Sequence, residues 1–184
     1  MQDRIKLLES KILPQAILAE FDEVFVAGRP DDSLAETFPE VTFLHIDPLS
    51  RTREEALHIR EVATRYSTGD ILTYMADDHA VEPNFTCSMP TWDWDVLTPQ
   101  RIHGVTEEEI NNGRPDGPWE NWNGYSPAHC QILKRRVWAQ VPWQSLHLTP
   151  WDVSITRLWR ELDFKVAWTD EIRCVDLEIE VGQE

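Results

Sequence analysis

The sequence predicts one α/β domain built on a mostly parallel sheet flanked by helices. In its first half, short apolar segments with strand character alternate with amphipathic helical segments. That alternation is typical of parallel strands joined by crossover helices. The chain has 184 residues, of which 41% are hydrophobic, and this is enough for one domain with its own core. We find no repeat or linker, so residues 1–184 form a single predicted domain.

The first half of the chain begins with an expected amphipathic helix over residues 3–20, in which Pro14 marks a kink or break. Strands are expected at 23–28 and 41–47, and the turn-like sequence RPDDS follows the first of them. Residues 52–70 contain the clearest helical pattern, which Gly69 ends.

An apolar strand is expected next, at 71–75. The second half predicts a strand at 95–102 and a polar, Trp-bearing loop over 107–124, which has the composition of a binding loop or lid. A helix over 149–162 follows, capped by Thr149 or Asp152. Closing strands are expected at 164–168 and 171–180.

The net charge of −16 counts against a nucleic-acid partner held through its phosphates. No signal peptide or apolar stretch of membrane-spanning length is present, so we expect a soluble, cytoplasmic protein without a membrane partner. Cys87, Cys130 and Cys174 are widely spaced and predict free, buried thiols rather than disulfides or a zinc site.

Ionisable residues follow two of the predicted strands. Asp77, Asp78 and His79 come directly after strand 71–75, and Asp31 and Asp32 follow strand 23–28. Ligands of parallel α/β sheets bind outside the carboxyl ends of the strands. Two carboxylates and an imidazole at such an end predict a shared divalent cation.

This order of parts resembles the nucleotide-diphospho-sugar glycosyltransferases of the GT-A fold, especially the large family-2 group, over about residues 20–178. In that family a helix ending in Gly-Asp, as at Gly69-Asp70, precedes a strand that carries an acidic metal motif, usually Asp-x-Asp. Here either Ala76-Asp77-Asp78 has lost its first acid, or Asp77-Asp78-His79 is an Asp-x-His variant similar to that of the polypeptide N-acetylgalactosaminyltransferases. We favour the second version, because side chains two apart point the same way on an extended chain.

The resemblance implies Mn²⁺ (or Mg²⁺) and a nucleoside-diphosphate sugar donor. Asp77 and His79 would hold the metal, and the imidazole favours Mn²⁺. Asp176 is the implied third ligand, with Cys174 as the weaker candidate. Residues 20–90 would form the nucleotide-sugar and metal half, in which Asp77 and either Asp31 or Asp32 contact the donor.

Residues 91–184 would form the acceptor half. Residues 150–166 resemble the family's EDxxLxxRLxxxGxxV helix, in which the acid acts as general base; Asp152 takes that position, and Arg157 matches a basic one. A carboxylate base implies direct displacement with inversion. Trp119 and Trp122 would stack on a sugar. A saccharide or small-molecule acceptor is expected, a modified DNA base being less favoured.

The family's usual first strand, of the type VSVIIPTYN, has no counterpart in the chain. Either the transferase is naturally short, or another segment or subunit fills that edge, and a homo-oligomer is one possibility. Simpler interpretations remain: an acidic turn at Asp77 to His79, an N-cap at Asp152, and a solvated helix start at Lys134 to Arg136. The alternative functions are a non-catalytic sugar- or nucleotide-binding module and a metal-dependent hydrolase or nucleotidyltransferase.

Overall fold

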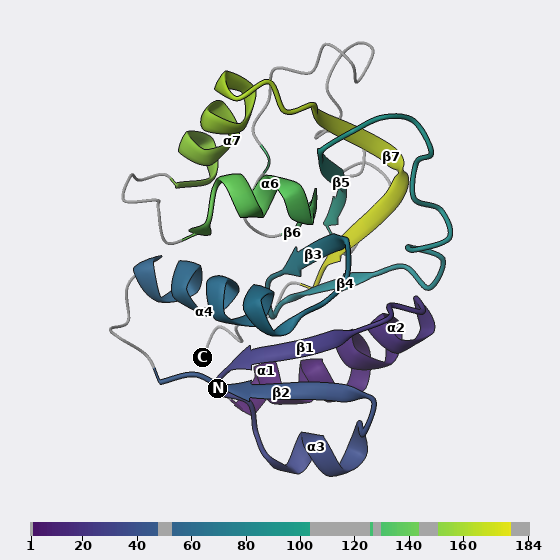
Figure 1. The fold of residues 1–184 in the computed structure, drawn as a ribbon. Helices are drawn as coiled ribbons and strands as arrows, with labels where there is room; N and C mark the ends of the chain where they lie inside the picture. The colour runs from purple at the N-terminus through teal and green to yellow at the C-terminus, as the bar shows by residue number, and fades with distance from the viewer. Residues whose placement is uncertain (1, 48–52, 104–125, 127–129, 144–150, 178–184) are drawn as a thin grey trace, which may run out of the picture.

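A computed structural model describes residues 2–47, 53–103, 126, 130–143 and 151–177. Its strands form two sheets (Figure 1): a pair of order β1-β2 and a five-stranded sheet of order β3-β6-β5-β7-β4. The strands are β1 (Val24–Gly28), β2 (Val41–His45), β3 (Ile71–Met75), β4 (His79–Val81), β5 (Val96–His103), β6 (Cys130–Lys134) and β7 (Val166–Asp176). The expected α/β class is therefore confirmed.

The sheets are mixed, which corrects the expectation of a mostly parallel sheet. β1 pairs with β2 in parallel, and so does β5 with β7. The pairs β3 with β6, β5 with β6 and β4 with β7 are antiparallel. Among the described strands, β1 and β2 form a simple parallel crossover through α3, whereas the later strands pair after longer connections.

The N-terminal segment is helical and changes geometry at the expected place. It comprises α1 (Gln2–Leu7), a π-helical turn η1 (Leu8–Ile12) and α2 (Leu13–Leu18). Pro14 lies in the first turn of α2 and has no N–H to donate to the preceding turn, so the regular α pattern is interrupted there. The turn after β1 contains a short helix that the sequence did not predict, α3 (Ser33–Thr37).

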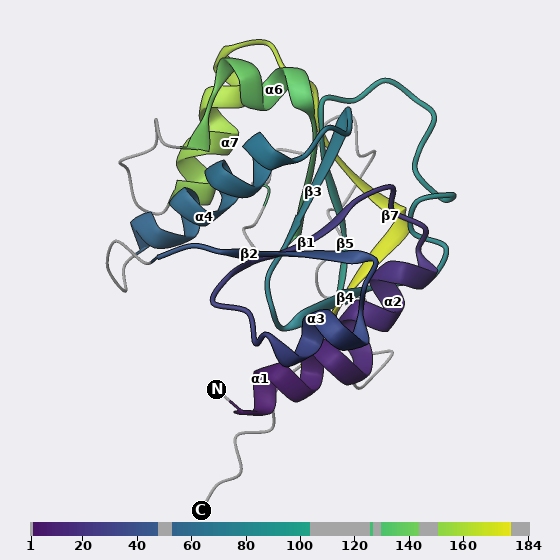
Figure 2. The ribbon, with the colours of Figure 1, turned by 60° about the horizontal axis from the view of Figure 1, so that its bottom comes forward.

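Helices cover both faces of the small sheet. Figure 2 shows α1, α2 and α3 on one side of β1 and β2, and α4 (Arg53–Tyr66) on the other. The remaining helices, α6 (Arg135–Gln140) and α7 (Trp151–Glu161), pack near α4 beside the five-stranded sheet. The two closing strands expected near the C-terminus form one strand, β7.

Three apolar clusters hold these layers together. Leu57, Leu133, Trp143 and Trp159 lie in the one between the five-stranded sheet and the helices α4, α6 and α7. A second cluster covers the opposite face of that sheet, and a third, smaller one joins α1 to α3 with β1 and β2. Trp94, Trp143 and Trp159 are buried, so packing accounts for these three tryptophans.

The cysteines are not joined by disulfides. Cys130 and Cys174 are buried as expected, but Cys87 is exposed, which corrects that part of the prediction. Within the described part of the chain, no helix is long and apolar enough to cross a membrane.

Candidate active site

A tight turn at the carboxyl end of β3 carries the acidic motif. The His79 N–H donates to the carbonyl of Ala76 over 3.2 Å, and Asp77 and Asp78 occupy the corner between β3 and β4. The expectation that Asp77 and His79 point the same way on an extended chain is therefore wrong. Asp77 is exposed, whereas His79 is only 3% exposed, because the chain reverses between them and β4 enters the core.

The imidazole of His79 is held by its neighbour. Its Nδ1 lies 2.5 Å from Oδ1 of Asp78, whose side chain is partly buried. A carboxylate on one ring nitrogen fixes the tautomer and orientation of a histidine, and Nε2 is then the nitrogen that can ligate a metal. Asp78 was absent from the predicted ligand set, although its place beside His79 in the sequence was a signal for this role.

The third predicted ligand comes close through strand pairing. In the antiparallel register of β4 with β7, Asp176 lies opposite His79, and Cys174 lies opposite Val81. The backbone thus favours Asp176 over Cys174 as the neighbour of His79. The side chain of Asp176 lies outside what the structure describes. Among the described residues, no group of three His, Cys, Asp or Glu side chains is placed to hold a metal ion.

Asp31 and Asp32 follow β1, as the sequence predicted, and both make local contacts. Oδ1 of Asp31 accepts hydrogen bonds from the Ser33 backbone N–H (2.9 Å) and hydroxyl (2.7 Å). The Ser33 hydroxyl is the main reason that the pKa of Asp31 lies below its ordinary value, and the N–H adds to it. Oδ1 of Asp32 lies 2.8 Å from Nε2 of His45, at the end of β2. This pair places polar groups at the carboxyl ends of both parallel strands.

Asp152 is partly buried in the first turn of α7. Its Oδ1 accepts a hydrogen bond from the N–H of Val153 at 2.9 Å. Because α7 begins at Trp151, Asp152 lies inside the helix rather than at its N-cap. The alternative cap, Thr149, lies outside the described residues. A carboxylate in the first turn is favoured by the positive end of the helix dipole.

Sequence reasoning missed a polar network that leads to this turn. Nη1 of Arg60 donates to Oε1 of Gln131 (2.7 Å), and Nε2 of Gln131 donates to the carbonyl of Ser126 (2.7 Å). The Ser126 N–H donates to Oγ1 of Thr156 (3.0 Å), whose hydroxyl donates to the carbonyl of Asp152 (2.7 Å). Gln131, Ser126 and Thr156 are all buried. The network therefore links α4, β6 and the first turn of α7.

Arg60 is the charged member of this network. Its guanidinium carbon lies 5.3 Å from the ring centres of both Tyr74 and Trp143. Desolvation lowers the pKa of Arg60 to about 10, and Tyr74, Cys130 and, least of the three, Asp152 offset part of that shift. The signal in the sequence was an arginine four residues after Ala56 and three before Ala63, on the apolar stripe of the predicted helix.

The register of β3 with β6 connects this network to the acidic turn. Gln131 lies opposite Tyr74 on β3, and Tyr74 comes three residues before Asp77 in the sequence. Arg60 and Asp77 also line the same cavity. The structure therefore places the partly buried guanidinium of Arg60 beside the strand that ends in the acidic motif.

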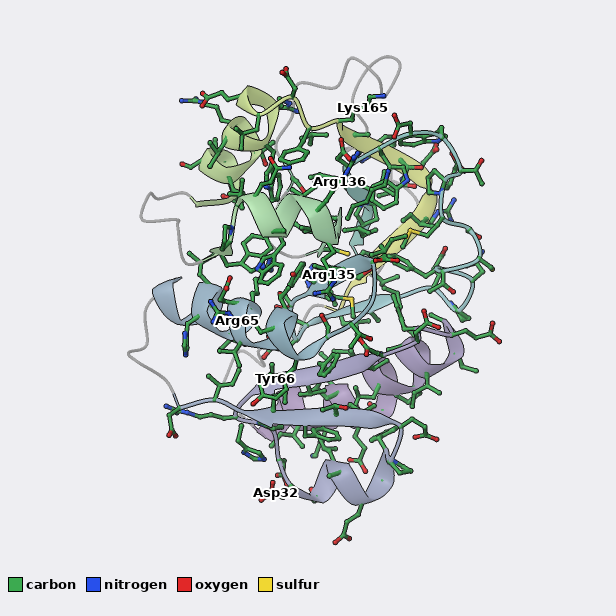
Figure 3. All side chains as sticks on the ribbon, viewed as in Figure 1. Asp32, Arg65, Tyr66, Arg135, Arg136 and Lys165 are labelled. Atoms are coloured by element: carbon green, nitrogen blue, oxygen red, sulfur yellow. The ribbon has the colours of Figure 1, made fainter. Side chains whose placement is uncertain are left out.

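The basic cluster Lys134 to Arg136 begins α6, and its side chains make structural contacts. Arg135 donates to the carbonyls of Gly69 and Thr64 and to the Ser67 hydroxyl, so it caps the end of α4 near the centre of the molecule (Figure 3). Arg136 pairs with Asp95, and Lys134 lies over the Trp94 ring. Arg136 and Lys165 lie in the upper half of the molecule in Figure 3, and Asp32 lies near the bottom.

The predicted binding roles of Trp119, Trp122 and Arg157 remain predictions. Trp119 and Trp122, with the predicted lid at 107–124, lie outside the described residues. Arg157 is exposed on α7.

The fold is shared with known glycosyltransferases. The chain is similar to the mannosyltransferase PcManGT from Pyrobaculum calidifontis, solved with GDP-Man and Mn²⁺, with a TM-score of 0.66 and 15% identity over 97% of this chain and 55% of that one. S. aureus TarS matches with a TM-score of 0.62 and 13% identity over 92% of this chain and 34% of that one. GalNAc-T7, solved with UDP, GalNAc and Mn²⁺, matches with a TM-score of 0.59 and 13% identity over 94% of this chain and 40% of that one.

The chain thus spans from about a third to about half of these three proteins. No family model matches the sequence. No curated protein matches it either. Identities this low establish the fold alone. The chain has the fold of the GT-A-type glycosyltransferases.

Proposed function

We propose that the protein is a metal-dependent, inverting glycosyltransferase that moves a sugar, in the manner of hexosyltransferases, from a nucleoside-diphosphate sugar to an acceptor hydroxyl. One observation carries the proposal: on a glycosyltransferase fold, the β4–β7 register sets His79 opposite Asp176, directly after the turn that presents Asp77. The neighbours solved with Mn²⁺ and a sugar nucleotide or its parts support the choice of donor and metal.

The donor groups at this strand end have the chemistry of a Mn²⁺ site. Asp77 and Asp176 offer oxygen, and His79, oriented by Asp78, offers an imidazole nitrogen. A metal bound there would neutralise charge on the diphosphate that leaves. Asp31 and Asp32, which follow β1 in the small sheet, would contact the nucleotide, and Trp119 and Trp122 would contact the sugars.

Asp152 would act on the acceptor side. In the transfer, the bond from the anomeric carbon to the diphosphate oxygen breaks and a bond to the acceptor oxygen forms, while the hydroxyl proton passes to the Asp152 carboxylate. The network through Thr156, Ser126 and Gln131 fixes the helix turn that carries Asp152. Arg157, on the exposed side of α7, would contact the donor.

The first experiment is calorimetric titration of GDP and UDP into the protein with Mn²⁺ or with EDTA. We expect binding that requires Mn²⁺ and is lost in Asp77→Ala. The matched control is Asp70→Ala, an exposed aspartate just before the other end of β3, which should bind as the wild type does. If neither nucleotide binds under any condition, the proposal is wrong.

A second variant tests the base. Asp152→Asn should keep nucleotide binding and reduce transfer by about 10² to 10⁴-fold. Binding without turnover in the wild type would instead indicate a non-catalytic binding module. Release of free sugar without an acceptor would indicate a hydrolase.

A further inference from the structure

A cavity of about 500 Å³ lies between the two sheets. Its walls include four consecutive residues of β1, Val24 to Ala27, and all of β3 from Ile71 to Met75. Successive side chains of a strand point to opposite faces, so a cavity that reaches every residue in a row runs along the edge of the strand. We call this cavity the interstrand groove.

Helices close the interstrand groove on its two faces. Leu8, Ile12 and Ala16 line it from η1 and α2, and Ile59 and Ala63 line it from α4. Figure 2 shows these helices on opposite sides of the small sheet. The groove therefore has strands beside it and helices above and below it, which are the surroundings of a strand in a layered α/β domain.

Both strands have an open edge in the described residues. β1 pairs only with β2, and β3 pairs only with β6. Open edges present rows of backbone N–H and C=O groups that can pair with another strand. The two strands run the same way across Figure 1, and Glu23 ties their starting ends together by accepting hydrogen bonds from the Thr68 N–H (2.8 Å) and hydroxyl (2.6 Å).

The charges along the interstrand groove indicate what would fit it. Glu20, Asp22 and Glu23 line the end where β1 starts, and Asp77 lines the end where β3 stops. Between them the walls are mostly apolar. Thr64, Thr73 and Tyr74 add hydroxyl groups to these walls, and Arg60 adds a charge, but its guanidinium already donates to Gln131.

We propose that the interstrand groove binds an extended segment of another polypeptide, apolar in its middle and basic at both ends. This segment pairs with the open edges of β1 and β3 and joins the two sheets. Its side chains pack on α2 and α4, and its terminal cations face the acidic ends of the groove. The volume alone also suits a small molecule, but the exposed backbone edges favour a peptide strand.

The test uses a synthetic peptide of about eight residues, in which Val and Thr alternate between one Lys at each end. Fluorescence anisotropy should show saturable binding that weakens with added salt. Hydrogen exchange should show new protection of amides in β1 and β3. A peptide of the same composition with Pro at two central positions cannot complete the ladder and should bind at least about tenfold more weakly.

Matched variants locate the binding site. Ala63→Trp fills the interstrand groove from α4 and should weaken binding by about tenfold or more, whereas Ala139→Trp, exposed on α6, should not change it. Circular dichroism checks that both variants fold.

Three results would overturn the proposal: equal binding of the Pro peptide, no binding of either peptide, or a concentration-dependent dimer that protects the same two edges. The last would identify a second copy of the chain as the occupant. Asp77 is also a proposed metal ligand, so peptide binding is measured in EDTA without nucleotide, and its failure is then separate from failure of the proposed transferase activity.

Discussion

The two sheets of the molecule are stabilised to different degrees. In the five-stranded sheet, β4 is fully buried, and so are Cys130 to Leu133 of β6. In the small sheet, most residues of β1 and β2 are only partly buried. Two strands alone are marginal in water, and parallel pairs are normally covered on both faces. The small sheet therefore depends on its helices more than the large sheet does.

This difference divides the candidate site. Asp77, His79 and Asp152 lie on or beside elements of the five-stranded sheet, where packing fixes the backbone. Asp31 and Asp32 follow a strand of the small sheet. Lower local stability is common in regions that move on ligand binding. We therefore expect the nucleotide-contacting end to adapt and the metal and base end to stay fixed.

The largest expected effect comes from truncating the large core. Ile132→Ala, at a side chain that is 0% exposed, should reduce the free energy of unfolding by about 2–5 kcal/mol and lower the urea midpoint of the whole protein. Leu34→Ala, at a site 2% exposed in the small cluster, should mainly speed hydrogen exchange in β1 and β2. If both variants reduce the free energy of unfolding by the same amount, the molecule unfolds as one unit. The proposed difference in stability between the two sheets is then wrong.

A smaller loss is expected where α4 joins the two regions. Glu61 is 1% exposed and accepts hydrogen bonds of 3.0 Å from the Trp138 indole and the Trp143 N–H. Glu61→Leu leaves the buried Trp143 N–H and the partly buried Trp138 indole without this acceptor, which should reduce the free energy of unfolding by about 3 kcal/mol. The exposed control, Glu161→Leu, should change stability by less than about 0.5 kcal/mol. Chemical denaturation of the two variants measures the difference, and equal midpoints would argue against a structural role for Glu61.

Local patterns in the sequence predicted most of the elements. The apolar runs of β1 and β3, the helical period of α4 and the break at Pro14 each depend on neighbouring residues alone. The mixed direction of the large sheet was not predicted, because the pairing of β6 with β3 and β5 joins segments far apart in the chain. The turn at Asp77 was read as extended for a related reason, since β4 turns away to pair with β7.

The positions of Asp77 and Asp31 after strands were predictable from the sequence, whereas their roles remain predictions. The network from Arg60 to Thr156 was not predictable, because its members are polar residues on buried faces of separate elements. A polar residue within an apolar stripe is a local signal, but its partners are set by tertiary packing. Arg60 could have been noticed from the sequence, whereas its bond to Gln131 could not.

A pH titration tests how well water is excluded from the side chain of Tyr74, which packs against Arg60 of this network. The Tyr74 hydroxyl lies 2.6 Å from Oγ1 of Thr64, and burial raises the pKa of Tyr74 above its ordinary value of 10.0. The neutral phenol therefore stabilises the fold below pH 10, and that contribution is lost as the pH rises through the higher pKa. Phenolate absorbance should show a late ionisation that Tyr74→Phe removes and Tyr66→Phe, at an exposed site, retains. A late step that survives in Tyr74→Phe would assign it elsewhere.

The smallest effect is expected at the end of β1. The Ser33 hydroxyl and N–H hold the pKa of Asp31 below its ordinary value of 3.8, so Asp31 stabilises the start of α3 above that pH, and the benefit is lost as the pH falls through the lowered pKa. Asp31→Ala should speed exchange in α3 at neutral pH but not in strong acid. Asp32→Ala removes only an exposed pair with His45 and should leave α3 unchanged. Faster exchange confined to α3 would support a lower local stability of the small sheet than of the large sheet. A lower urea midpoint for the whole protein would instead show that the two sheets unfold together.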